Sequence, residues 1–305
     1  MAERNIFRGV NSIKFHQRFK NDNDCLKYLA EVKWLNGYEC KRCKNDKFGK
    51  GKNTHNKRCT KCRYDESPTV GRMFEKLKFS ILKAFHIAFK ISTKKKGMSS
   101  LELSNEFELR QMTCWSFKQK LQQVMKSSLN SPLTGVVHVD EFVIGGPEKG
   151  KRGRSKGLKK LIVLAVEIFE NGVGRAYADV IEHSSAKELG GFLMKYVSRE
   201  AEVISDKWKG YTPLKKEFKN LKQVSSDNGN NFKELHIHIM NIKGWLRGIH
   251  HHCSRDRMQN YLDEYHFRYN RRSNMETIFD VLIRKIVNYK SRSIKSVSNK
   301  CELNA

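Results

Sequence analysis

Proline, low-complexity linkers and long apolar runs are all scarce in this chain of 305 residues. It has only four prolines, so domain boundaries have to be read from changes of pattern. No apolar run approaches the roughly 20 residues that span a bilayer, and the N-terminus lacks the apolar segment of a secretory signal. We therefore expect a cytoplasmic protein whose eight cysteines are reduced or metal-bound and form no disulfides.

Acidic residues are also few. The chain has 32 Asp and Glu against 60 Lys and Arg, which gives a formal net charge of +28. A charge this far from zero destabilises a compact monomer by self-repulsion and favours a polyanionic partner. Because the excess is spread along the chain, it favours a long nucleic-acid track over a single basic arm. A soluble basic protein without such a partner is the alternative.

Four of the cysteines form two CxxC pairs, Cys40/Cys43 and Cys59/Cys62, separated by fifteen residues. This spacing is typical of a zinc ribbon, in which each pair presents two thiolates to one tetrahedral Zn²⁺. The stretch is too small and polar to bury a core, so the metal has to supply its folding free energy. No thioredoxin-like βαβ pattern surrounds either pair, which argues against a redox motif. The other four are expected to be ordinary apolar residues: Cys25, Cys114, Cys253 and Cys301.

Changes of pattern divide the chain into four parts. Residues 20–70 form the expected zinc-ribbon domain, and residues 72–128 carry apolar residues at helical spacing. Within the latter, Ser99 or Ser100 is a candidate N-cap, followed closely by Glu102. A short helix, a polar break and a longer helix are compatible with a helix-turn-helix DNA-binding segment, although a helical spacer fits equally well. Residues 133–290 have an α/β pattern, and residues 291–305 resemble a basic tail.

The α/β region has a definite order of elements. We expect three antiparallel strands, a helix, a short strand ending in an Asp, a helix, another short strand and then helices. The segments are 136–146, 161–169, 173–181, 184–199, 203–206, 212–218, 221–226, 232–250, 255–270 and 275–289. This is the order of an RNase-H-like fold, so the expected class is α/β (α+β), a mixed sheet flanked by helices.

Two adjacent carboxylates, Asp140 and Glu141, occupy the middle of the first strand. Successive strand side chains point to opposite faces, so only one of them can face a given site. An Asp inside an apolar strand is unfavourable unless it is paired or bound to a metal, although an edge strand with Asp140 in water is the alternative. In the expected fold Asp140 lies beside Asp206, the last residue of the fourth strand. Close carboxylates bind Mg²⁺ (or Mn²⁺), and two such ions can clamp the oxygens of a phosphodiester during cleavage.

With these features the sequence resembles the insertion-sequence transposases of the ISXO type, which combine an N-terminal zinc ribbon with a DDE-like catalytic domain. The matching motifs are the ribbon cysteines, HVDEFVIGG with the following GKRGRSKG, VISDKWKGY, and NFKELHIHIMNIKGWLRGIHHHCSRDRMQNYLDEYHFRYNRR at 231–272. The resemblance covers about residues 20–285. It implies Mg²⁺-dependent strand cleavage and strand transfer at the inverted-repeat ends of a mobile element. The partner would be double-stranded DNA, bound by a homo-oligomer.

The resemblance also implies site residues. Many relatives of the broader class have a Glu at the third catalytic position, but this sequence is similar to a subgroup with Asn241 there and Lys243 two residues on. It thus implies catalytic Asp140, Asp206, Asn241 and Lys243, the first three as Mg²⁺ ligands. The Asn241 side-chain oxygen can ligate Mg²⁺, and Lys243 can hold phosphate oxygens.

Helical spacing leaves alternatives for the third ligand. Helix positions two apart point about 200° apart, so Asn241 and Lys243 cannot both face one metal in a regular helix. Glu234, His238 and Asn241 share a helix face. Glu234 is therefore an alternative carboxylate, and His238 an alternative ligand or proton shuttle, unless both are surface polar groups.

Three functions fit these patterns. The first is a transposase with catalytic Mg²⁺ and a zinc ribbon. The second is a non-catalytic zinc-ribbon DNA-binding protein, such as a decayed transposase, because no third carboxylate aligns. The third is a nuclease of RNase-H type acting on RNA–DNA hybrids.

Overall fold

The computed structural model describes residues 6–145, 159–250 and 253–289. The expected basic tail (291–305) and the GKRGRSKG motif (150–157) lie outside these residues. The chain divides into two compact units. The first comprises Met1–Lys94, Leu103–Val124 and Asn274–Ala305, and the second comprises Lys95–Glu102 and Met125–Ser273. Within the described ranges, none of the helices combines the length and apolarity needed to cross a bilayer.

The first unit is largely helical. Its elements are α1 (Ser12–Arg18), α2 (Asp22–Lys33), α3 (Ile81–Thr93), α5 (Gln111–Met125), the 3₁₀ turn η3 (Met275–Thr277) and α9 (Ile278–Asn288), with most of α4 (Ser100–Phe107). Polar side chains cap the first three helices, because the oxygens of Asn11, Asn21 and Ser80 accept N–H groups of their first turns. A buried aromatic cluster forms the core, in which Phe15 stacks on Phe89 with ring centroids 4.2 Å apart and Phe279 joins from α9.

Helix α9 groups with the first unit, although the α/β domain was expected to extend to residue 290. The sequence pattern put it in the α/β domain, but α9 packs on α2 and α3 within the first unit. Its Asp280 accepts a hydrogen bond from Tyr28 of α2, and Glu276 just before it accepts one from the Gly9 N–H. The apolar period of a helix shows that one face is buried, but it does not identify the partner that covers that face.

The cap expected near residue 100 is present at Ser99. The Ser99 Oγ accepts the Glu102 N–H (3.1 Å), and the Glu102 carboxylate accepts the Ser99 N–H (2.7 Å). This reciprocal pair is a capping box and fixes the start of α4. Glu108, with a φ of 50°, ends that helix before α5 begins.

A small antiparallel sheet carries the cysteine pairs. It has the order β1-β2-β3, with β1 (Phe48–Lys50), β2 (Lys57–Cys59) and β3 (Asp65–Glu66). The Glu66 side chain is 1% exposed and bonds to Lys33 Nζ of α2 (2.8 Å) and to Lys41 Nζ (3.2 Å). This buried carboxylate therefore links the small sheet to α2.

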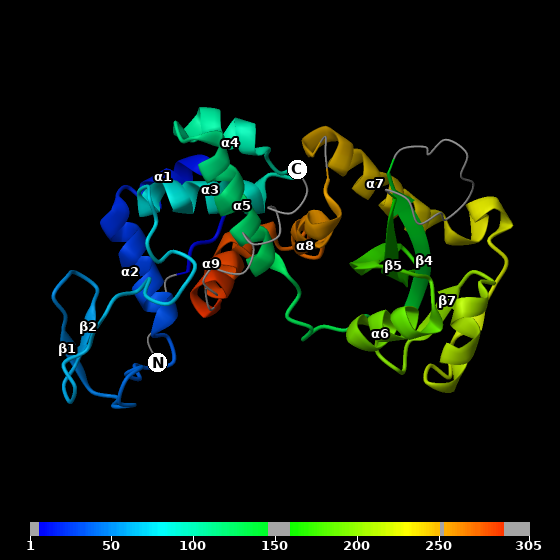
Figure 1. Ribbon diagram of the computed structural model, residues 1–305, viewed down its shortest axis with the longest axis horizontal. Helices are drawn as coiled ribbons and strands as arrows, with labels where there is room; N and C mark the ends of the chain where they lie inside the picture. Colours follow the sequence, from blue (N-terminus) through cyan, green and yellow to red (C-terminus); the bar gives the residue numbers. More distant parts are fainter. Residues whose placement is uncertain (1–5, 146–158, 251–252, 290–305) are drawn as a thin grey trace, which may run out of the picture. The chain divides into compact units, whose positions relative to one another are not determined.

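The second unit is built on a five-stranded sheet of order β6-β5-β4-β7-β8 (Figure 1). Its elements are β4 (Val136–Ile144), β5 (Lys160–Phe169), β6 (Gly172–Ile181), α6 (Ala186–Tyr196), β7 (Glu202–Ser205), η1 (Lys209–Lys216), β8 (Lys222–Gln223), η2 (Asp227–Phe232), α7 (Lys233–Ile249) and α8 (Arg255–Tyr269). Strands β4, β5 and β6 pair antiparallel, whereas β7 and β8 run parallel to β4. The expected mixed sheet flanked by helices is confirmed. The α-helix expected after residue 211 is a 3₁₀ helix containing Pro213.

Each face of this sheet has its own core. Val137 and Val139 of β4 pack with α6 and η1, whereas Phe142 packs with α7 and α8. The alternation of β4 therefore sends Asp140 to the α7 face and Glu141 to the α6 face.

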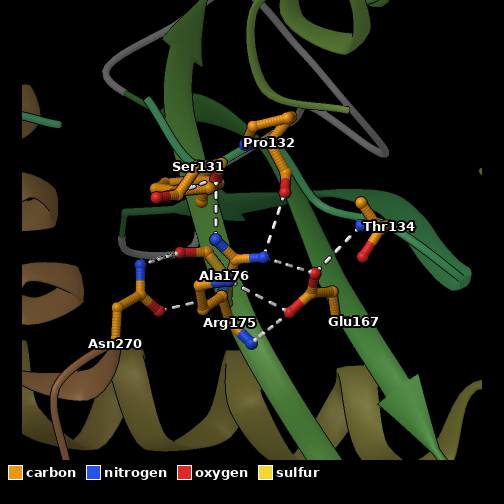
Figure 2. Close-up of polar contacts among 8 residues, drawn as sticks. Ser131, Pro132, Thr134, Glu167, Arg175, Ala176 and Asn270 are labelled. Carbon is orange, nitrogen blue, oxygen red and sulfur yellow. Dashed lines mark hydrogen bonds and ion pairs between the residues drawn. The ribbon is translucent and has the colours of Figure 1, made fainter. Parts of the chain in front are cut away.

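A buried ion pair fixes the start of this unit (Figure 2). Glu167 is at a β-bulge in β5 and accepts hydrogen bonds from the N–H groups of Thr134 and Arg175, both at 2.9 Å. The Arg175 guanidinium bonds to the same carboxylate (3.0 Å) and to the carbonyls of Ser131 and Pro132 (both 3.1 Å). The segment that enters β4 is thereby held against the sheet.

Asn270, at the end of α8, closes the neighbouring edge of β6. Its side chain accepts the Ala176 N–H (2.9 Å) and donates to the Ala176 carbonyl (2.8 Å), as a paired strand would do (Figure 2). Position 174 has to be a glycine, because a Cβ there would lie 2.6 Å from Glu167 Oε2.

Candidate active site and cysteine cluster

The strand register brings Asp140 and Asp206 together. Strands β4 and β7 are parallel neighbours, and Val139 is opposite Ser205. Asp140 and Asp206 are the next residues on the two chains, so their backbones lie side by side although they are far apart in sequence. Both residues are partly accessible, which leaves their carboxylates open to a ligand from solvent.

Burial and mutual repulsion perturb Asp140. Its side chain is 19% exposed, and burial is the main reason why the pKa of this carboxyl is raised. The Glu141 N–H donates to its Oδ1 (2.7 Å) and opposes the shift, while the charge of Asp206 adds to it. A second carboxylate close enough to raise the pKa of Asp140 marks a site where a bound cation relieves repulsion.

His236 of α7 approaches Asp140. Its Nε2 is 3.5 Å from Asp140 Oδ2. Lys243 is two helical turns further on, on the same side of α7, and its Nζ is 5.5 Å from the centroid of the Phe142 ring. Since Phe142 follows Asp140 on the same face of β4, α7 presents both a histidine and a lysine along the strand that carries Asp140.

The other predicted residues of α7 point elsewhere. Asn241 is exposed and is roughly 160–200° around the helix from Lys243. Glu234 lies near His138, where its charge opposes the lowering of the His138 pKa by burial. His238 is buried with its Nε2 3.2 Å from His266 Nε2 of α8, and burial lowers its pKa well below the usual value. Among the residues that the structure describes, the ion-pair and hydrogen-bond partners of Asp140 are His236 and the Glu141 N–H, and not these three side chains.

Sequence reasoning missed His236. The available signal was its seven-residue spacing to Lys243, which puts both on one side of a helix. The sequence alone could not show which side of that helix faces the sheet. Glu141, the other carboxylate of the strand, is buried on the opposite face, where it and burial raise the pKa of Tyr211 well above the usual value.

The four ribbon cysteines form a compact ligand set. Their sulfurs all lie within 4.8 Å of one another, with Cys40 and Cys62 Sγ atoms 3.5 Å apart and Cys43 and Cys59 Sγ atoms also 3.5 Å apart. The residue after each pair, Lys44 or Arg63, has a left-handed φ near 60° that folds the chain back around the sulfurs. The two CxxC turns therefore have matching backbones.

Local N–H groups favour thiolates in this cluster. Burial opposes ionisation of Cys59, but the backbone N–H groups of Cys62 and Lys61 outweigh it and lower the pKa of Cys59 to about 6. The Tyr64 backbone lowers the pKa of Cys62, whereas burial and the three neighbouring sulfurs raise it to about 12. A fourth thiolate among three others needs a cation, so the donor set fits Zn²⁺.

Only this cysteine cluster, within the described part of the chain, has three or more ligand atoms within 4.8 Å of one another. The described residues around Asp140 do not form such a group.

Comparison with known proteins finds a similarity to transposase sequences. Residues 132–270 match the family described as the ISXO2-like transposase domain. A relative from Halobacterium salinarum, described as an uncharacterized protein in transposable element ISH50, is 22% identical over 277 residues, covering 82% of this chain and 91% of the relative.

Two solved structures align weakly. A pre-cleavage Mos1 transpososome has a TM-score of 0.31 and 11% identity over 64% of this chain and 75% of that chain. A Mos1 transposase paired-end complex with the left transposon end has a TM-score of 0.24 and 12% identity over 64% and 76%. Scores this low add nothing to the fold assignment, which rests on the sheet order. Residues 132–270 of this chain are therefore similar to the ISXO2-like transposase domain.

Proposed function

We propose that this protein binds the ends of its mobile element and catalyses Mg²⁺-dependent DNA strand cleavage and strand transfer. The observation that carries the proposal is the pairing of Asp140 with Asp206 through adjacent parallel strands of an ISXO2-like domain. The net charge of +28 supports a DNA partner, because phosphate contacts supply most of the affinity of such proteins.

Asp140 and Asp206 are the proposed metal-binding carboxylates. Burial is the main cause of the raised pKa of Asp140, and the charge of Asp206 adds to it, which supports this role. Oxygen donors are what Mg²⁺ or Mn²⁺ requires. When bound, a pair of such ions would stabilise the attacking and leaving oxygens of the phosphodiester. Lys243 would hold a non-bridging phosphate oxygen from the same side of the site.

His236 is the proposed third ligand. The resemblance to the Asp-Asp-Asn-Lys subgroup favours Asn241, but Asn241 is exposed on the other side of α7. The 3.5 Å approach of His236 Nε2 to Asp140 Oδ2 favours the histidine. Glu234 and His238 are less suitable, because their described contacts are with His138 and α8.

The first unit would supply DNA binding. We propose that Cys40, Cys43, Cys59 and Cys62 hold one Zn²⁺, and that the lysines and arginines of the ribbon contact phosphates. Helices α4 and α5 would bind the element ends as a helix-turn-helix, with catalysis assigned to the second unit. The working complex would be a homo-oligomer assembled on DNA in the cytoplasm.

Strand transfer with Mg²⁺ tests the function directly. The substrate is a duplex carrying the DNA that flanks this coding sequence, with supercoiled plasmid as target. Asp140→Asn and Asp206→Asn should abolish product, whereas Asp256→Asn, an exposed carboxylate of α8, should not. Full activity of either site variant would refute the proposal.

Two other outcomes correspond to the alternative functions. Tight, salt-sensitive DNA binding without product at any Mg²⁺ concentration would indicate a decayed, non-catalytic protein. Cleavage restricted to the RNA strand of an RNA–DNA hybrid would indicate a nuclease of RNase-H type.

A further inference from the structure

Trp208 is a large aromatic side chain that remains exposed two residues after Asp206. The residue is 41% exposed, whereas Tyr211 and Leu214 of the following helix η1 are buried in the core. Exposed tryptophans are uncommon because they forgo the burial of a large apolar surface. The exposed part of this one lies in the segment that follows a candidate catalytic carboxylate, where a bound DNA strand could reach it.

Hydrogen bonds from three different segments fix this residue. The Trp208 N–H donates to Asp206 Oδ1 (3.0 Å), and its carbonyl accepts from Gln223 Nε2 of β8 (2.9 Å). The indole Nε1–H donates to the Ser184 carbonyl, which precedes α6 (2.9 Å). The ring is therefore held in one orientation while part of its surface stays open to solvent.

Gly210 makes room for this orientation. A Cβ at position 210 would lie 2.7 Å from Trp208 Nε1 and 2.8 Å from the Ser184 carbonyl oxygen. Any larger residue would displace the ring from Ser184. The chain thus uses a glycine to keep the indole seated beside Asp206.

Lysines precede and follow Trp208 in the sequence. Lys207 and Lys209 are exposed, so a short segment presents a cation, an aromatic ring and a second cation in sequence. Alternation of positive charge with an aromatic platform is how proteins bind unpaired nucleotides, because each base has a π-face and each linkage a phosphate. A nucleotide whose phosphodiester lies at Asp140 and Asp206 would be within reach of such a platform.

We propose that Trp208 is a stacking platform for an unpaired nucleobase next to the reacting phosphodiester, with Lys207 and Lys209 contacting the adjoining phosphates. This inference rests on the proposed transposase function and extends it. An enzyme that reacts at one strand of a duplex gains from holding a neighbouring base out of the stack. A ring that is already fixed loses little conformational entropy when the base binds.

Binding without catalysis tests the platform. The probe is a duplex with a short single-stranded thymine overhang, compared with the same duplex blunt-ended, with Ca²⁺ in place of Mg²⁺. The wild-type protein should bind the overhang duplex about ten-fold more tightly, as expected when one base stacks on an aromatic ring. Trp208→Ala should bring the two affinities close to equality, whereas Trp208→Phe should keep most of the preference.

Two glycine variants provide a matched control. Gly210→Ala should reduce the preference as strongly as Trp208→Ala, because it displaces the ring without removing it. Gly191→Ala of α6 should change nothing, since a Cβ there meets no atom within 4 Å. Melting temperatures should confirm that all four variants fold. Overhang binding should also quench tryptophan fluorescence in the wild type and much less in Trp208→Phe.

The outcomes separate this inference from the proposed function. An overhang preference that survives Trp208→Ala and Gly210→Ala in folded protein overturns the platform, even if the wild type transfers strands. A wild type without any overhang preference overturns it as well. A wild type that shows the preference but gives no product with Mg²⁺ supports the platform and contradicts the proposed function.

Discussion

The two candidate metal-binding regions of this molecule are built in opposite ways. The cysteine cluster takes all four ligands from residues 40–62, and its sulfurs are gathered within 4.8 Å. The candidate active site takes Asp140, Asp206 and His236 from β4, the end of β7 and α7, and it stays open. A closed set of four ligands is typical of a structural metal, whereas an open set leaves positions for a substrate. The comparison predicts that one metal supports folding and the other supports only chemistry.

The largest effect should come from breaking the closed cluster. Cys59→Ser removes a buried ligand, and loss of a structural Zn²⁺ removes about 10 kcal/mol or more of apparent binding free energy. We expect less than a tenth of a zinc per chain and rapid proteolysis within the ribbon. Zinc analysis and limited trypsin digestion measure both. Cys253→Ser, in the second unit, should keep one zinc, and a Cys59→Ser protein that keeps it would end the structural assignment.

Breaking the open site should remove activity and spare the fold. Asp140→Asn should lower the rate of strand cleavage by about a thousand-fold, as loss of a main electrostatic group does. Its melting temperature without metal should be unchanged or higher, because the substitution removes a buried charge that Asp206 repels. Single-turnover cleavage and thermal melts measure the two effects. If Asp140→Asn unfolded as Cys59→Ser is expected to do, both regions would support folding and the contrast between them would be wrong.

The same contrast explains what the sequence could reveal. The cysteine spacing is local, so the ribbon could be predicted from residues 40–62 alone. The Asp140–Asp206 pair could be predicted from the order of elements, since that order determines which strands are neighbours. The position of His236 depends on how α7 is rotated against the sheet, and the partner of α9 depends on tertiary packing. Neither follows from periodicity, because a helical pattern identifies an apolar face without identifying what covers it.

The two units can also be compared by one buried carboxylate in each that is not a candidate metal ligand. Glu66 in the ribbon is neutralised by two lysines, and Glu167 in the second unit by Arg175 and two N–H groups. Glu167→Gln should destabilise the second unit by about 3 kcal/mol at neutral pH, because it leaves Arg175 without a carboxylate partner. Zinc content should stay at one per chain. Chemical denaturation followed by a probe in the second unit measures the change.

The pH dependence of this variant follows from the Glu167 pKa. Burial alone would raise it, but the N–H groups and guanidinium of Arg175, with the Thr134 N–H, outweigh burial and hold it below the usual value. A depressed pKa contributes stability that is present above the unfolded pKa, near 4.3, and is lost as pH falls through the folded pKa. The difference between wild type and Glu167→Gln should therefore be full at pH 7 and shrink in acid. A difference that grows on acidification would contradict this assignment.

The smallest effect should come from exchanging a ligand of the open site. Imidazole nitrogen is a poor donor for Mg²⁺ and a better one for Mn²⁺, whereas carboxylate oxygen suits both. A site completed by His236 should therefore bind Mn²⁺ at least about ten-fold more tightly than Mg²⁺, and His236→Glu should narrow that ratio. Free Mn²⁺ measured by electron paramagnetic resonance, with Mg²⁺ as competitor, reports the ratio without requiring catalysis.

Asn241→Ala is the matched control for this exchange, because Asn241 is the ligand that the family resemblance favours and it lies on the same helix. If His236 completes the site, His236→Ala should weaken Mn²⁺ binding by about ten-fold, and Asn241→Ala should leave it unchanged. The reverse result would mean that α7 rotates or bends when metal binds, bringing Asn241 to Asp140. In that case the open site would differ from the cysteine cluster in a further way. Its ligands would come together only when the metal binds, whereas the four cysteine sulfurs are already close together without a metal.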